Sequence, residues 1–208
     1  MSRINLAALR QAEVHTDPYD FLVVPDFISP AALPQINTDY PAIETAANHN
    51  LENLSGGPAF NALMDEIQGP EVASAVSELF DMDLVSLPTT VTVRKFCERT
   101  DGNIHTDHKS KVITLLVYFN ESWDHKEGQL RVLRSKDNIE DYAAQITPLG
   151  GTLLAFRRTD HSWHGHTRFV GERRMVQLNY LDQSPMAVAA QRISRFGTHF
   201  MKNVLGMR

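Results

Sequence analysis

The feature that most constrains the fold is a succession of short segments rich in apolar and β-branched residues, which begins after Pro88. These segments are residues 89–96, 111–120, 129–133, 151–156 and 173–181. Only short turn-rich stretches separate them, and none of these stretches has the periodicity of a helix. Parallel strands need long, usually helical, crossovers, so the pattern predicts antiparallel pairing. We therefore expect an antiparallel barrel or jelly roll in the second half of the chain.

Helical patterns flank this β region. The segment from Phe21 to Ile28 predicts a strand that runs into a loop, and Ser29-Pro30 predicts the start of a helix, with Ser as the cap and Pro at the first helical position. Two further helices are expected at residues 59–67 and 71–79, divided by Gly69-Pro70. The chain has no repeat and no Gly/Ser linker. We therefore predict an α+β fold of one domain, residues 1–208, with a β core at about residues 88–182 and a C-terminal helix from Ala187.

Composition excludes several classes of protein. With 42% hydrophobic and 22% charged residues, the sequence is that of a globular protein, and its net charge of −5 argues against a general nucleic-acid binder. Cys97 is the only cysteine, so a disulfide framework is excluded and a cytoplasmic location is expected. We expect Cys97 to be buried rather than a nucleophile. No apolar run has the length of a membrane span, so a soluble protein is predicted.

The C-terminal segment is basic as well as periodic. Its expected apolar face carries Ile193, Phe196, Phe200 and Val204, and its basic residues are Arg192, Arg195, Lys202 and Arg208. The face is expected to pack on the chain's own barrel. The alternatives are a homodimer contact, which we favour of the two, and a membrane surface.

Nine histidines are present, and one subset suggests a metal site. In an extended segment, residues two apart point to the same side, so His105 and Asp107 would present an imidazole and a carboxylate together. A second group, His161-Ser-Trp-His164-Gly-His166, follows the expected strand at residues 151–156. We predict His164 as the third ligand and keep His166 as the alternative. His108 and His161 are expected near the site or on the surface.

Two histidines and one carboxylate on one face of a metal ion leave three coordination positions open. This arrangement is typical of non-haem iron(II) oxygenases, in which a chelating 2-oxo acid and O2 fill these positions. A structural zinc site would close its shell, usually with cysteines that this chain lacks.

Arg173 completes the pattern, because a guanidinium binds a carboxylate bidentately and stays charged when buried. Strand alternation places Arg173, Met175 and Gln177 on one face, with Arg174 and Val176 on the other. We therefore expect Arg173, and not Arg174, to point inward.

Together, His105-Thr-Asp107, His164 and Arg173 resemble the iron(II)- and 2-oxoglutarate-dependent dioxygenase superfamily, especially its prolyl-hydroxylase-like branch. The stretches 117–123 and 127–133 resemble the paired strands that follow the His-x-Asp motif in that branch, and the resemblance covers about residues 89–181. It implies a double-stranded β-helix with supporting helices.

The resemblance also implies roles for single residues. Fe(II) would be held by His105, Asp107 and His164, and 2-oxoglutarate by Arg173 and Tyr118, with Leu130 packed nearby. Two positions depart from the family pattern. Phe96 stands where a tyrosine is frequent, and Met175 where Ser or Thr is frequent.

The function implied is hydroxylation of a small-molecule or protein substrate, driven by O2 and 2-oxoglutarate, with release of succinate and CO2. Two alternatives stay open at this point. One is a cupin-like metalloenzyme that does not use 2-oxoglutarate, which would leave Arg173 without a role. The other is a non-catalytic binding module on the same barrel. No motif in the expected loops names the substrate.

Overall fold

The computed structural model describes residues 2–183. The elements in this part of the chain are, in order, α1 (Leu6–Arg10), β1 (Phe21–Val24), α2 (Leu33–Thr38), β2 (His49–Asn50), the 3-10 helix η1 (Leu51–Asn53), α3 (Pro58–Ile67), α4 (Pro70–Phe80), β3 (Thr89–Cys97), β4 (Lys111–Tyr118), β5 (Leu130–Leu133), β6 (Tyr142–Ile146), β7 (Leu153–Arg157), β8 (His164–His166) and β9 (Gly171–Leu181).

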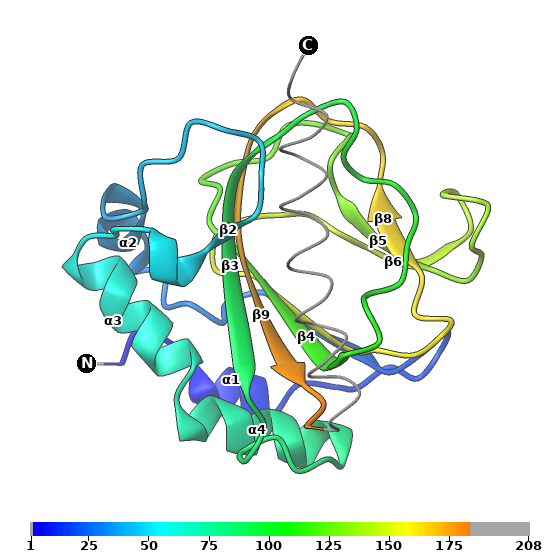
Figure 1. Cartoon of the computed structure of the whole chain (residues 1–208), viewed down its shortest axis with the longest axis horizontal. Coiled ribbons are helices and arrows are strands. Elements are labelled where there is room, and N and C mark those ends of the chain that lie inside the picture. The colour runs from blue at the N-terminus through cyan, green and yellow to red at the C-terminus, as the bar shows by residue number, and fades with distance from the viewer. Residues whose placement is uncertain (1, 184–208) are drawn as a thin grey trace.

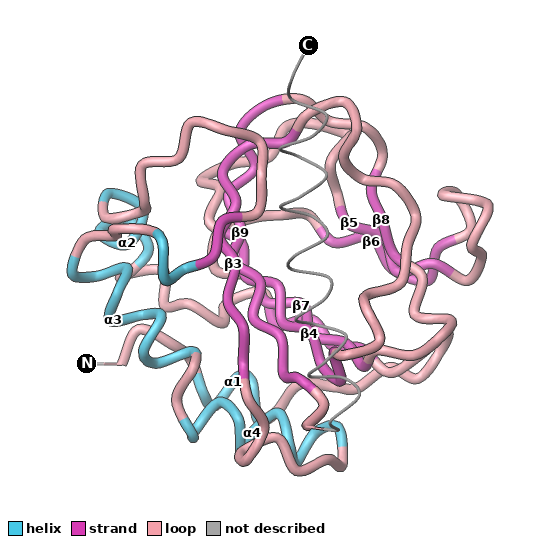
Figure 2. The backbone as a smooth tube through the Cα atoms, viewed as in Figure 1, coloured by secondary structure: helices cyan, strands magenta, loops and turns pink. Residues whose placement is uncertain are grey.

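The strands form two sheets (Figures 1 and 2). The larger has the order β1-β7-β4-β9-β3-β2, and the smaller has the order β6-β5-β8. Every pairing between these strands is antiparallel, as the sequence predicts. Neighbours in the larger sheet are mostly distant in the chain, so its hydrogen bonds join the N-terminal strand β1 to the β-rich second half.

The helices cover one face of the larger sheet and form the main core with it (Figure 1). Val93, Leu115 and Val176 point from the sheet into this core, where α3 contributes Phe60 and Leu63. Each of α3 and α4 begins with Pro after a capping Gly. Proline fits the first helical turn because the amide that it lacks has no partner there, so the two helices start close to where the sequence predicts.

The opposite face of the larger sheet lies toward the smaller sheet. A second apolar cluster fills the space between them, with Leu116, Leu154 and Phe156 from the larger sheet and Leu130 and Val132 from β5. Alternation along each strand therefore sends one set of side chains to the helices and the other set between the sheets. Tyr118 and Leu130 belong to this second set.

Three features differ from the predictions or lie beyond them. The predicted helix at Ser29-Pro30 is wrong: Ser29 O accepts bonds from the amides of Ala32 and Leu33 in a turn, and α2 begins only at Leu33. Strands β6 and β8 were not predicted. The predicted C-terminal helix and its dimer contact lie outside the described residues. None of the described helices has the length and hydropathy needed to span a membrane.

Candidate metal centre and the adjoining pocket

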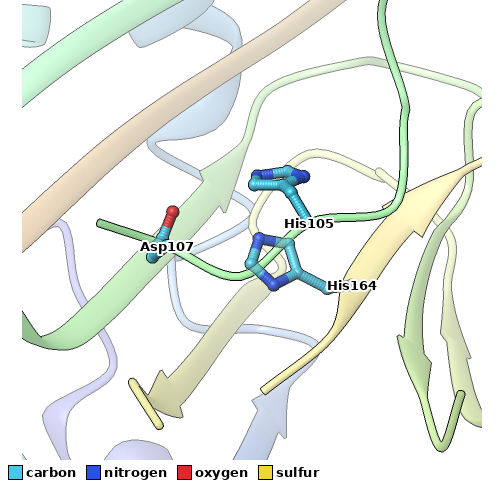
Figure 3. A group of neighbouring side chains, drawn as sticks. All are labelled: His105, Asp107 and His164. Carbon is cyan, nitrogen blue, oxygen red and sulfur yellow. The ribbon is translucent and has the colours of Figure 1, made fainter. Parts of the chain in front are cut away.

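Three side chains from different parts of the chain converge between the two sheets. His105 and Asp107 lie in the loop between β3 and β4, and His164 begins β8. One ligand atom of each lies within 4.8 Å of the others. A backbone bridge fixes this arrangement, because the amides of His105 and His164 each donate to the other's carbonyl at 3.0 Å. Figure 3 shows both imidazoles and the carboxylate turned toward one shared space.

Hydrogen bonds orient both rings. His105 Nδ1 lies 2.9 Å from Asn103 O, and His164 Nδ1 lies 3.0 Å from Ser162 O. Since a carbonyl oxygen only accepts, each Nδ1 carries the proton. When the ring is neutral, its Nε2 lone pair is then free to bind a metal, which is how ligating histidines are usually fixed in proteins.

The environment of His164 keeps its imidazole neutral. The ring is buried and packs between the rings of Phe156, at 4.7 Å, and His105, at 4.4 Å. Burial lowers the pKa of His164 to about 4. A neutral imidazole is the form that binds metal. The Tyr19 hydroxyl donates to Trp163 O at 2.9 Å and so holds the backbone at the residue before His164.

Asp107 is buried, and both of its carboxylate oxygens have partners. Thr114 Oγ1 donates to Oδ2 at 2.6 Å, and Lys111 Nζ lies 3.0 Å from Oδ1. Burial raises the pKa of Asp107, but the Lys111 ammonium, His164 and the Thr114 hydroxyl outweigh it, so the pKa lies below its ordinary value. The side chain is therefore an anionic ligand at neutral pH.

A pocket extends from these three residues between the sheets. Besides His105, Asp107 and His164, it is lined by Asn48, Arg94, Gly102, Thr114, Leu116, Leu130, Phe156, Gly165, His166, Arg173, Met175 and Gln177. As predicted, Arg173, Met175 and Gln177 share one face of β9. Val176 lies on the other face, in the helix-side core.

Arg173 lines the same pocket and is only 2% exposed. Its Nε donates to Gly128 O at 2.8 Å, Nη1 lies 3.3 Å from Met175 Sδ, and Nη2 lies 3.4 Å from Tyr118 Oη. A thioether and a distant phenol are weak partners for a cation. Within residues 2–183, no carboxylate forms an ion pair with Arg173.

Tyr118 lies beside this arginine, and Leu130 lines the same pocket. The Tyr118 ring is fully buried, and the Arg173 guanidinium stands 5.2 Å from its centroid. Burial raises the pKa of Tyr118, partly offset by Arg173, so its hydroxyl stays protonated and can donate. Leu130 is 6% exposed and lines the pocket.

His166 also lies in this pocket, although it does not join the group of three. Its Nδ1 lies 2.8 Å from Thr167 O, and Gly102 passes so close that an added Cβ would stand 2.6 Å from that nitrogen. Burial, and next the Arg173 charge, lower the pKa of His166 to about 4. His108 and His161 are exposed, as expected.

Sequence reasoning missed several residues of the site: Thr114, Lys111 and Arg94. The resemblance puts Phe96 where a tyrosine is frequent in the family. The register of β3 against β9 shifts between Arg94 and Phe96, and Arg94 lines the pocket whereas Phe96 is absent from its lining. Cys97 is buried, as predicted, and burial raises the pKa of its thiol, partly offset by the nearby Arg173 charge.

Comparisons with known proteins agree with this geometry. Residues 93–181 match the family model of the 2OG-Fe(II) oxygenase superfamily. No curated protein is detectably similar in sequence. A prolyl-4-hydroxylase from Pseudomonas putida has a similar fold, with a TM-score of 0.55, 15% identity, and coverage of 88% of this chain and 95% of that one.

Two further solved structures are similar. A 2OG-Fe(II) oxygenase family oxidoreductase from Burkholderia pseudomallei gives a TM-score of 0.56 at 11% identity, with 86% of this chain and 91% of that chain covered. A viral collagen prolyl hydroxylase from Paramecium bursaria Chlorella virus-1, solved with 2OG, gives 0.55 at 17% identity, with coverage of 78% and 96%. At these identities the structural similarity establishes the fold.

The family match spans β3 to β9 and includes the three converging side chains, the buried arginine and the pocket between them. Two imidazoles and one carboxylate are the donor set that non-haem Fe(II) centres with open positions use. The cofactors of the family are Fe(II), 2-oxoglutarate and O2. Residues 93–181 therefore match the 2OG-Fe(II) oxygenase superfamily, and the chain has the fold of solved prolyl-4-hydroxylases.

Proposed function

We propose that this protein hydroxylates a C–H bond of an unidentified small-molecule or protein substrate, with release of succinate and CO2. His105 Nε2, His164 Nε2 and Asp107 Oδ1 hold Fe(II). Arg173 and Tyr118 bind the distal carboxylate of 2-oxoglutarate, and Leu130 packs against its carbon chain. The bound iron and 2-oxoglutarate supply the oxidising chemistry that transfers an oxygen atom of O2 to the substrate.

The observation that carries this proposal is the buried guanidinium of Arg173. A buried charge without a counter-ion is costly, so such groups are normally paired. Within the described chain, Arg173 has a backbone carbonyl, a thioether, a phenol and the Cys97 thiol around it, and no carboxylate forms an ion pair with it. A ligand carboxylate placed between Arg173 and Tyr118 would supply the missing negative charge.

The chain's own residues prepare the site for this ligand. Tyr118 keeps its proton and can donate to a carboxylate, while Gly128 O holds Arg173 through Nε and leaves both terminal nitrogens for the ligand. Leu116, Leu130 and Phe156 line the same pocket and restrict water. In such surroundings, each charged hydrogen bond is stronger than in water.

The two sheets support a finer description of the fold. We infer that the larger sheet and β6-β5-β8 form the two walls of a double-stranded β-helix. We also infer that residues 1–208 form a single oxygenase domain. The second apolar cluster supports this, because it joins β1 to the strands of both sheets.

The test is anaerobic addition of 2-oxoglutarate to the Fe(II)-loaded protein. We expect a weak visible charge-transfer band. Arg173→Ala should shift the titration to at least about a hundredfold more 2-oxoglutarate, since truncating one partner of a buried charged pair costs several kcal/mol. Arg174→Ala is the matched control, because Arg174 does not line this pocket, and it should titrate like the wild type.

The absence of a band with iron bound would contradict the proposal and favour a cupin-like enzyme or a binding module. The same band at unchanged 2-oxoglutarate concentration in Arg173→Ala would contradict the assignment of the anchor. Release of succinate by the wild type in the presence of a cell extract would exclude the binding module.

A further inference from the structure

Lys111 occupies an unusual position beside the candidate metal ligands. It begins β4 at the bulge opposite Leu181, and its ammonium lies 3.0 Å from Asp107 Oδ1. The side chain of Lys111 is 19% exposed and that of Asp107 is 7% exposed, so the ion pair is largely shielded from water. Nothing in the assignment of iron ligands gives this lysine a role.

The second carboxylate oxygen of Asp107, Oδ2, already accepts a hydrogen bond. Thr114 Oγ1 donates to Oδ2 at 2.6 Å and lies 3.2 Å from Asn179 Oδ1, and Asn179 Nδ2 donates in turn to Thr90 Oγ1 at 3.3 Å. These contacts link the loop to β4, β9 and β3. Oδ1 is therefore the oxygen left for a metal ion, and it is the one that the Lys111 ammonium contacts.

A divalent ion and the ammonium cannot share this oxygen without cost. A metal–carboxylate bond is about 2 Å long, so an ion on Oδ1 and an ammonium at 3.0 Å from that atom would lie at most about 5 Å apart. Like charges at that separation, shielded from water, repel strongly. The lysine side chain is flexible, and its partial exposure gives it a route outward.

We propose that Lys111 determines metal affinity: its ammonium is the counter-ion of Asp107 in the metal-free protein, and the incoming ion displaces it. This inference rests on the proposed iron ligands and deepens them. Metal binding is then an exchange of one cation for another, so the affinity is lower than the three ligands alone would give. The same exchange keeps Asp107 paired while the site holds no metal.

The first experiment measures affinity for Mn²⁺, a redox-stable substitute for Fe(II), by calorimetry on the metal-free protein. Lys111→Met keeps the length of the side chain and removes its charge. We expect it to bind Mn²⁺ at least about tenfold more tightly, because removing the repulsion favours the metal-bound state. Lys111→Arg keeps the charge and should bind within about twofold of the wild type. Lys109→Met, an exposed neighbour, is the control and should not change.

The second experiment needs no variant. Lys111 and Lys109 of the wild type are acetylated briefly with acetic anhydride, and mass spectrometry follows both lysines with and without saturating Mn²⁺. Lys111 should react slowly in the metal-free protein, because it is paired and mostly covered, and several-fold faster with metal. Lys109 should react equally in both states.

Unchanged or weaker Mn²⁺ binding by Lys111→Met overturns the proposal, and so does acetylation of Lys111 that stays the same or falls with metal. If Lys111→Met does not fold, the acetylation result decides. Failure of the proposed function would give a different result. The wild type would then show no specific Mn²⁺ binding and would behave like Asp107→Ala.

Discussion

At the scale of single residues, Thr114 decides how Asp107 presents its carboxylate. Its hydroxyl binds Oδ2 at 2.6 Å inside the β4–β9 pair. We predict that Thr114→Val weakens Mn²⁺ binding about 10- to 100-fold, the usual effect of removing a group that orients a ligand. Thr114→Ser keeps the hydroxyl and should bind almost normally. Calorimetry measures the Mn²⁺ affinity of both variants. Equal affinities for Thr114→Val and the wild type would contradict this role of Thr114.

The two histidines of β8 give a sharper residue-scale prediction. His164→Asn should abolish stoichiometric Mn²⁺ binding, because His164 supplies one of the three converging ligand atoms. His166→Asn should keep stoichiometric binding, since the His166 ring lies outside that group. Metal content after dialysis checks both variants, and the reverse result would make His166 the ligand.

Much of the site could be predicted from residue spacing, and some of it could not. His105, Asp107, His164 and Arg173 stand out because metal and carboxylate chemistry restricts the residue types and strand alternation sets their direction. Lys111 and Thr114 carry no such signal, since a lysine or threonine in a strand usually has no special role. They matter only because the loop folds Asp107 back against them.

At the scale of elements, the loop before β5 supports the anchoring arginine. Gly128 has φ +74°, its carbonyl accepts from Arg173, and an added Cβ would stand 2.7 Å from Trp123 Cζ2. We predict that Gly128→Ala lowers the free energy of unfolding by about 1 to 3 kcal/mol and weakens 2-oxoglutarate binding. Lys126→Ala, exposed on the same loop, is the control.

Chemical denaturation and the charge-transfer titration measure the two effects of Gly128→Ala. A variant with normal stability and normal titration would mean that the loop does not hold Arg173 in place. Reduced stability with a normal titration would limit the role of the glycine to folding.

Local sequence patterns predict the elements that have clear start signals or apolar alternation, and they miss the elements that lack both. The helices α3 and α4 were predicted within about two residues because proline and glycine mark their starts. Strand β6 was missed because Tyr142–Ile146 has little apolar alternation and packs only at one end. Strand β8 was missed because its three residues, His-Gly-His, have no β signal of their own and are held by pairing with β5.

At the scale of the whole molecule, the two cores have different roles. The helix-side core stabilises the fold, and the cluster between the sheets adjoins the candidate metal centre. Phe60 is fully buried on the helix side, where it packs against the rings of Tyr40 and Phe119. We predict that Phe60→Ala lowers the free energy of unfolding by about 3 to 5 kcal/mol. Its Mn²⁺ affinity, measured where the variant is still folded, should stay within about twofold of the wild type.

Urea denaturation and calorimetry check this separation. A large loss of Mn²⁺ affinity in folded Phe60→Ala would show that the helix-side core also sets the geometry between the sheets. Alternation in the sequence predicts the two faces of β9. The order β1-β7-β4-β9-β3-β2 lies beyond local pattern, because it depends on pairings between segments far apart in the chain.

The bridge between His105 and His164 has a consequence for the chain as a polymer. The two residues are far apart in sequence and come from different segments, yet they face one another across hydrogen bonds at 3.0 Å. An ion held by both imidazoles would act as a reversible cross-link, present in the native chain and lost on unfolding. The midpoint temperature of thermal unfolding should therefore rise with the concentration of free metal. The melting temperature would then depend on the iron supply.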